Sequence, residues 1–67
     1  MAFAENLKSF REGKSLSQAE LAEMTDVSQP MIAQYEKGKK VPSIFVGVDL
    51  ARVLNTIVEE LVNGKKE

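Results

Sequence analysis

Apolar residues recur at helical spacing along almost the whole chain, and the strict alternation that is typical of strands is rare. Near the start, Phe3, Leu7 and Phe10 form a stripe with i, i+4, i+7 spacing, which predicts a helix over about residues 3–12. Gly13 follows directly, at the place where a glycine commonly ends a helix. The opening segment therefore predicts one amphipathic helix with a single buried face.

Serine residues mark the expected starts of the next helices, because a serine hydroxyl accepts a hydrogen bond from the first turn of a helix. Ser17 and Glu20 have the spacing of a capping box and predict a second helix. Ser28 predicts a third helix after a break of about three residues, in which Asp26 can adopt the left-handed conformation. Ser43 predicts the start of a fourth helix in the same way.

The pattern continues to the end of the chain. Asn55 is a left-handed terminator for the fourth helix, and Thr56 with Glu59 forms a second capping box that would open a short fifth helix. The chain is thus expected to adopt an all-α fold, a compact bundle of five short helices. We expect one domain over residues 1–64, with residues 65–67 as a frayed tail.

The third expected helix, over about residues 29–37, separates apolar from polar side chains. At about 100° per residue, Met31, Ile32 and Tyr35 gather on one side. The other side carries Gln29, Pro30, Ala33, Gln34 and Lys37. Two helices joined by a short turn, the second with a polar outer face, have the geometry of a helix-turn-helix, whose second helix enters the DNA major groove. A glutamine amide in that groove can form two hydrogen bonds with adenine.

Composition narrows the chemistry that this fold can carry. The 67 residues include no cysteine and no histidine, which excludes disulfides and thiolate metal sites and removes the commonest general base. The carboxylates fall at helix caps and outer faces, so we expect no enzyme, no metal and no cofactor. No apolar run reaches the ~20 residues of a membrane span. We therefore expect a cytoplasmic protein that does not associate with a membrane.

The charge balance weighs against nucleic acid as a partner, because DNA-binding domains are typically basic and this chain has a net charge of −1. The distribution matters more than the sum, since DNA contacts only one face of a protein. Three of the nine basic residues, Lys37, Lys39 and Lys40, lie directly after the third expected helix. They form either a contact with DNA or an ordinary solvated turn.

Three runs of residues carry a family resemblance. They are LSQAELAE at residues 16–23, VSQ at 27–29 and YEKGKKVP at 35–42. With Ile32 between the last two, this pattern resembles the lambda-repressor and Cro-like family, also called the Xre family, of helix-turn-helix DNA-binding regulators. The resemblance covers nearly the whole chain and rests on several fixed spacings at once.

The resemblance implies roles for individual positions. It places four residues at base-reading positions: Gln29, Pro30, Ala33 and Gln34. It places five at the DNA backbone: Gln18, Lys37, Lys39, Lys40 and Ser43. It also implies a structural ion pair between Arg11 and Glu36, and the sequence places Arg11 beside the apolar stripe of the first helix. The alternative for Gln29 and Gln34 is a solvated surface without a partner.

The fourth helix departs from the family pattern. Gly47 stands where a core leucine is expected, and Phe45 and Val46 occupy positions that are usually polar. The last two helices also carry more apolar residues than one buried stripe needs, and exposed apolar patches usually mark an interface. Either the core wraps both helices, or they form a homodimer interface that includes Phe45, Val46, Val58 and Val62.

These features predict a sequence-specific DNA-binding transcriptional regulator, a repressor that binds a near-palindromic operator on double-stranded DNA as a homodimer. We expect no small-molecule substrate. The alternative is a helix-turn-helix module that binds another protein, such as an antitoxin or an anti-repressor partner. A pI of about 5.4 and the apolar C-terminal half favour that alternative.

Overall fold

The computed structural model describes residues 2–64, and within them the chain forms five α-helices and no strand, as the sequence predicts. The helices are α1 (Ala2–Gly13), α2 (Gln18–Met24), α3 (Gln29–Glu36), α4 (Ile44–Val53) and α5 (Val58–Asn63). The tail expected at residues 65–67 lies outside the described residues.

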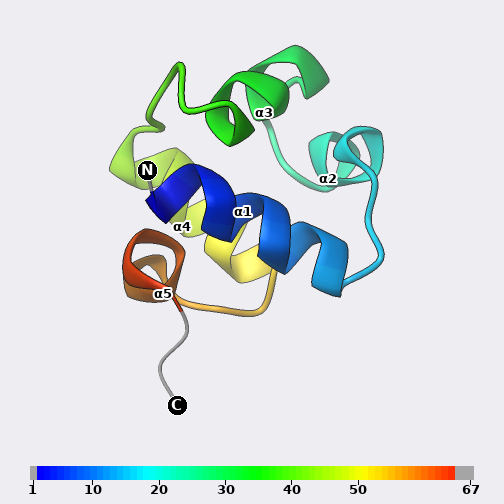
Figure 1. Ribbon diagram of the computed structural model, residues 1–67. Coiled ribbons are helices and arrows are strands. Elements are labelled where there is room, and N and C mark those ends of the chain that lie inside the picture. The colour runs from blue at the N-terminus through cyan, green and yellow to red at the C-terminus, as the bar shows by residue number, and fades with distance from the viewer. Residues whose placement is uncertain (1, 65–67) are drawn as a thin grey trace.

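Helix α1 occupies the centre of the bundle (Figure 1). It packs against α3 and against α5, while α2 packs against α3 and α4 packs against α5. The largest fully buried side chains come from all five helices and from Leu54, which directly follows α4. They are Leu7, Leu21, Ile32, Leu50, Leu54 and Leu61. One hydrophobic core therefore holds the α2–α3 pair on one side of α1 and the α4–α5 pair on the other.

The serine caps form as predicted. Ser17 and Glu20 make a complete capping box, in which the Ser17 hydroxyl accepts from the Glu20 amide and the Glu20 carboxylate accepts from the Ser17 amide. The hydroxyl of Ser28 accepts from the Met31 amide, and that of Ser43 accepts from Val46 in the same way. Each cap satisfies one of the amide groups that a helix start leaves without a partner.

The end of α1 differs from the prediction. Helix α1 includes Gly13, and the left-handed residue is Ser15, with a φ of 58°. The Leu16 amide donates to the Arg11 carbonyl and the Ser15 amide to Glu12, which is the hydrogen-bond pattern of a Schellman motif. This later ending brings Leu16 against the core, and that apolar contact explains why a serine accepts a conformation that favours glycine.

The start of α5 also differs from the prediction. Asn55 takes the left-handed conformation that was expected, with a φ of 58°. The Thr56 amide then donates to the Ala51 carbonyl and so belongs to the ending of α4. Thr56 therefore does not cap the next helix. Helix α5 begins after Ile57, which provides no side-chain cap, and the Thr56 hydroxyl donates to the Glu60 carboxylate instead.

The turn between α2 and α3 forms without the left-handed Asp26 that was expected. Within residues 2–64, positive φ angles occur at Ser15, Gly38, Asn55 and Gly64, and Asp26 is not among them. Thr25 instead leaves α2 in an extended conformation, and its hydroxyl donates to the Leu21 carbonyl and accepts from the Val27 amide. The threonine side chain thus shapes the turn by bridging the end of α2 to the next residues.

Candidate nucleic-acid interface

The outer side of α3 is the polar surface that the sequence predicts. Gln29 and Pro30 at its start are exposed, and Ala33 and Gln34 one turn later are half-buried. The opposite side of the helix holds Ile32 and Tyr35 in the core. Because the core fixes one side, the other presents its polar groups in a constant orientation. Their contact with bases remains a prediction.

A basic segment continues from the end of α3 towards α4. Gly38, with a φ of 74°, turns the chain out of α3, and Lys37, Lys39 and Lys40 on either side of it are exposed. The sequence contains no acidic residue between Lys37 and Val48. The side of the molecule formed by the end of α3 and the start of α4 is therefore positively charged, although the whole chain is slightly acidic.

The predicted pairing of Arg11 with Glu36 is present and ties α1 to the end of α3. The Arg11 Nε donates to Glu36 Oε2 at 2.7 Å, and Nη2 donates to Oε1 at 3.1 Å. The third nitrogen, Nη1, donates to the Leu16 carbonyl at 2.7 Å. The side chains of Arg11 and Glu36 are only 10% and 5% exposed, so the two charges neutralise each other where water has little access.

Gln18 is part of the same polar network, a contact that the sequence does not predict. The Gln18 Nε2 donates to Glu36 Oε1 at 3.0 Å. Glu36 therefore receives hydrogen bonds from α1 and from the first residue of α2, and it fixes the angle between the two helices of the motif. The expected contact of Gln18 with a phosphate remains a prediction.

The network changes how its charged groups titrate. Burial by itself raises the pKa of Glu36, but hydrogen bonds from Arg11 and Gln18 and the positive charges of Arg11 and Lys8 outweigh it and hold that pKa below its usual value. The hydrogen bond to Glu36 raises the pKa of Arg11 against the opposing effect of burial. Both groups are charged at neutral pH.

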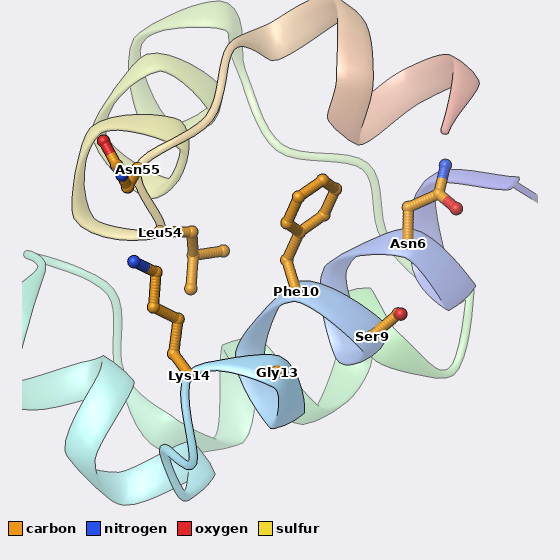
Figure 2. Close-up of a pocket in the computed structure, with 7 residues that line it drawn as sticks. All are labelled: Asn6, Ser9, Phe10, Gly13, Lys14, Leu54 and Asn55. Carbon is orange, nitrogen blue, oxygen red and sulfur yellow. The ribbon is translucent and has the colours of Figure 1, made fainter. Parts of the chain in front are cut away.

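Three clefts among the described residues lie away from α3. Figure 2 shows one of them, with a volume of about 370 Å³. It is lined by Phe10 of α1, by Lys14 directly after that helix and, across from them, by Leu54 and Asn55 at the end of α4. Two others lie along α4 and α5. None of these three clefts is lined by Glu36 or by another residue of α3.

Residues 2–64 contain neither a candidate metal site nor a candidate membrane span. No group of three or more acidic residues is placed to hold a metal ion. No helix among them is long and apolar enough to cross a membrane.

The four residues predicted for a dimer interface fall into two classes. Phe45 is 82% exposed and Val62 is exposed to about half of its area, whereas Val46 and Val58 are half-buried against the core of their own chain. Further exposed apolar side chains surround them on α4, on its preceding loop and before α5: Val41, Ile44, Val48 and Ile57. Their role in an interface remains a prediction.

Comparison with known proteins identifies relatives over almost the whole chain. The sequence profile of the helix-turn-helix family matches residues 7–61. The HTH-type transcriptional activator BcrR of Enterococcus faecalis is 33% identical over 66 residues, which are 98% of this chain but 32% of that protein. The chain thus spans about a third of the length of this relative. Control protein C.SmaI of Serratia marcescens is 34% identical over 59 residues, which are 88% of this chain and 70% of the relative.

A solved structure has the same fold. The P22 c2 repressor, in a crystal structure with a synthetic operator, superposes with a TM-score of 0.90 at 25% sequence identity. The superposition covers 97% of this chain and 98% of that chain, so all five helices have counterparts in it.

Proposed function

This chain belongs to the helix-turn-helix family of transcriptional regulators, and we propose that it is a sequence-specific DNA-binding repressor that occupies a near-palindromic operator as a homodimer. The observation that carries the proposal is the outward-facing polar side of α3, with three exposed lysines directly after it and a buried ion pair behind it. The fold likeness to the P22 c2 repressor, which was solved on operator DNA, supports the same assignment.

Base recognition in this proposal depends mainly on two glutamines. Gln29 and Gln34 carry amide groups that can bond to the N6 and N7 atoms of adenine. Pro30 and Ala33 lie on the same side of α3 and offer only apolar contact and shape. The helix therefore reads few bases by hydrogen bonds, and one copy has little with which to distinguish one DNA sequence from another.

Contacts with the DNA backbone would come from two sides of α3: from the segment between α3 and α4, and from the start of α2. Lys37, Lys39 and Lys40 supply positive charge, which neutralises phosphates and releases counterions. Ser43 begins α4, where backbone amides favour phosphate. Gln18, at the start of α2, would contact the phosphates on the other side of α3.

Dimerisation solves the problem of the small reading surface. A two-fold dimer presents two copies of α3 about 34 Å apart, one helical turn of DNA, and so doubles the base contacts. The exposed apolar residues of α4 and α5, Phe45 and Val62 among them, favour an interface there. Because each copy carries nearly zero net charge, two copies do not repel each other strongly.

Other classes of function have less support. A module that only binds another protein would have no use for the lysines after α3, although the acidic pI of about 5.4 still favours it. We propose that the chain is not an enzyme, since the clefts named above lack a convergent set of catalytic groups. We also propose that it acts in the cytoplasm.

Selection of bound DNA from a random pool tests the proposal. We expect enrichment of a site with two inverted half-sites whose centres lie about 10 base pairs apart or a multiple of that distance. A reporter gene placed behind the selected site should then be expressed less when the protein is present. Failure to enrich any sequence would exclude specific DNA recognition and favour the protein-binding alternative.

A further inference from the structure

The side-chain amide of Gln18 is bonded to the buried ion pair in one orientation only. Its Nε2 donates to Glu36 Oε1 at 3.0 Å. An ionised carboxylate accepts hydrogen bonds and donates none, whereas a glutamine amide has an accepting oxygen and a donating nitrogen. Glu36 therefore excludes the reversed orientation, in which the oxygen of Gln18 would face the carboxylate.

Glu36 is suited to orient another side chain, because it is itself held in place. Its side chain is 5% exposed, and two nitrogens of Arg11 donate to its two oxygens. The third nitrogen of Arg11 donates to the Leu16 carbonyl at 2.7 Å, which anchors the guanidinium in turn. A residue whose position is locked by packing and hydrogen bonds can fix the geometry of a neighbour that contacts a ligand.

The rest of the Gln18 amide is available to a partner outside the chain. The amide nitrogen carries two hydrogens, and Glu36 accepts one of them. The Gln18 side chain makes no other hydrogen bond within residues 2–64. No side-chain nitrogen or oxygen of these residues is buried without a partner, so the Gln18 Oε1 lies at the surface. The second N–H of the same small planar group is therefore close to the surface, where a phosphate oxygen can accept from it.

We propose that Glu36 is a positioning residue for DNA binding, which holds the Gln18 amide so that its second N–H donates to a phosphate. One amide then bridges two acceptors, the carboxylate inside the protein and the phosphate of the DNA. This role rests on the proposed function and on the phosphate contact of Gln18, and it adds the group that determines which end of the amide meets the phosphate. Without the carboxylate, Gln18 is free to turn its oxygen outward, and two acceptors would then face each other.

This role predicts that removing one negative charge weakens binding to DNA. Glu36→Gln keeps the size of the side chain, but the new amide no longer selects one orientation of Gln18. We expect the affinity for the selected site to fall at least about threefold, since a hydrogen bond to a charged group is weakened. Long-range electrostatics predict the opposite sign, because a less acidic protein attracts DNA more strongly.

Glu12→Gln is the matched control for the change in charge. Glu12 also lies beside Arg11, at 4.0 Å from Nη2, but its side chain is 58% exposed and makes no hydrogen bond with Gln18. The substitution removes the same charge from the same neighbourhood and should leave the affinity for DNA unchanged or slightly higher. A loss in Glu36→Gln alone is therefore not an effect of net charge.

A double substitution separates positioning from folding. Gln18→Ala removes the contact itself, and we expect it to weaken binding at least about tenfold. If Glu36 acts through Gln18, then adding Glu36→Gln to Gln18→Ala causes no further loss of affinity. A general disturbance of the α2–α3 pair would add its own loss. Affinities are measured by fluorescence anisotropy at a temperature where circular dichroism shows each variant to be folded. Additive losses would overturn the proposal, as would wild-type affinity in Glu36→Gln.

Modified DNA provides a readout that a purely structural role would not change. Each phosphate of the selected site is replaced in turn by a neutral methylphosphonate. The phosphate that Gln18 contacts is the one at which the wild type loses affinity and Gln18→Ala does not. Glu36→Gln should be much less sensitive than the wild type at that phosphate, and Glu12→Gln should be as sensitive as the wild type. Full sensitivity in Glu36→Gln would show that Gln18 binds the phosphate without help from Glu36.

If Glu36→Gln does not fold, NMR spectroscopy of the wild-type chain with isotope-labelled glutamine gives a second test. The Nε2 signals of Gln18 are identified by their loss in Gln18→Met. When the selected duplex is added, we expect one Nε2 hydrogen to keep its chemical shift, because the bond to Glu36 remains, and the other to move. Movement of both signals, or of neither, would overturn the proposal.

The outcomes separate the positioning role from the repressor function. A selected site at which the losses are additive would keep the function and refute the role of Glu36. Absence of any selected site would refute the repressor, and with it the phosphate contact that the role of Glu36 requires.

Discussion

Different kinds of interaction hold the α2–α3 side and the α4–α5 side of the bundle to α1. On the α2–α3 side, Arg11, Gln18 and Glu36 form a buried network of charged hydrogen bonds that fixes both helices of the motif against α1. On the α4–α5 side, the contacts are apolar, the core lacks a side chain at Gly47, and α5 begins without a side-chain cap.

This difference matches the tasks that we assign to the two sides. Recognition of bases needs a helix with a fixed orientation, and directional hydrogen bonds supply that orientation. Association with a second copy needs exposed apolar surface, which a fully packed side would not offer. In the proposed dimer, the α2–α3 side acts within one copy, whereas the exposed apolar residues of the α4–α5 side are covered only by a second copy.

The largest predicted effect concerns the network. Glu36→Ala leaves the Arg11 guanidinium buried without its partner, and we expect a loss of about 3–5 kcal/mol in the free energy of unfolding, measured with urea. Asp49→Ala is the control, because its partner Arg52 is 76% exposed, and we expect it to cost about 0–1 kcal/mol. Similar losses for the two variants would remove the distinction between a structural pair and a surface pair.

Acid weakens the Arg11–Glu36 pair without removing a side chain. We therefore expect a smaller loss in the free energy of unfolding than Glu36→Ala causes. The pKa of Glu36 is below its usual value of 4.5 in the folded chain, so Glu36 stabilises the fold at pH values above 4.5. That contribution falls progressively as the pH drops below 4.5 and Glu36 becomes protonated. Urea titrations of the wild type and of Glu36→Gln at several pH values isolate the contribution of Glu36 to the free energy of unfolding. Parallel pH profiles for the two proteins would contradict the assignment.

The next effect concerns base recognition by α3. Gln34→Ala removes a side chain that can form two hydrogen bonds with a base, and we expect binding to the selected site to weaken by about 1–3 kcal/mol. Binding to random DNA should change much less, as measured by fluorescence anisotropy on both duplexes. An equal loss of affinity for the two duplexes would show that Gln34 contacts the DNA backbone or supports folding, and that it does not read a base.

A gain in stability is predicted on the other side of the bundle. Gly47→Ala adds a methyl group into open space within α4, and we expect the free energy of unfolding to rise by about 1 kcal/mol. The measurement needs dilute protein, so that dissociation of a dimer does not contribute. A loss of stability would mean that the space at Gly47 is already filled in the isolated chain.

The smallest predicted effect concerns electrostatics. Lys39→Ala should weaken binding to all DNA sequences alike and reduce the slope of log K against log salt by about 0.9. Lys14→Ala is the matched control, since it removes a lysine that lines the cleft in Figure 2, away from α3. A slope reduced equally by both variants would assign the effect to net charge instead of to a contact.

The sequence predicted those features that depend on neighbouring residues. The caps at Ser17, Ser28 and Ser43 form because each hydroxyl reaches an amide only three residues away. The polar side of α3 follows from helical periodicity, and Asn55 ends α4 as expected. These elements require no knowledge of where the other helices lie.

The errors arose where tertiary contacts decided between local alternatives. Helix α1 continues through Gly13 because Leu16 then reaches the core, and Thr56 is used to end α4 before it can cap α5. The bond between Gln18 and Glu36 joins residues 18 positions apart. It depends on the angle between two helices, which periodicity does not contain.

The central claim is that reading DNA requires two copies, each with a complete α2–α3 side. It is tested most directly by titrating the protein into a labelled duplex that carries the selected site and measuring the mass of the complex by sedimentation. We predict two chains per duplex, with little of the singly bound species at half-saturation. A stable complex of one chain per duplex, with the same affinity for a single half-site, would contradict the account.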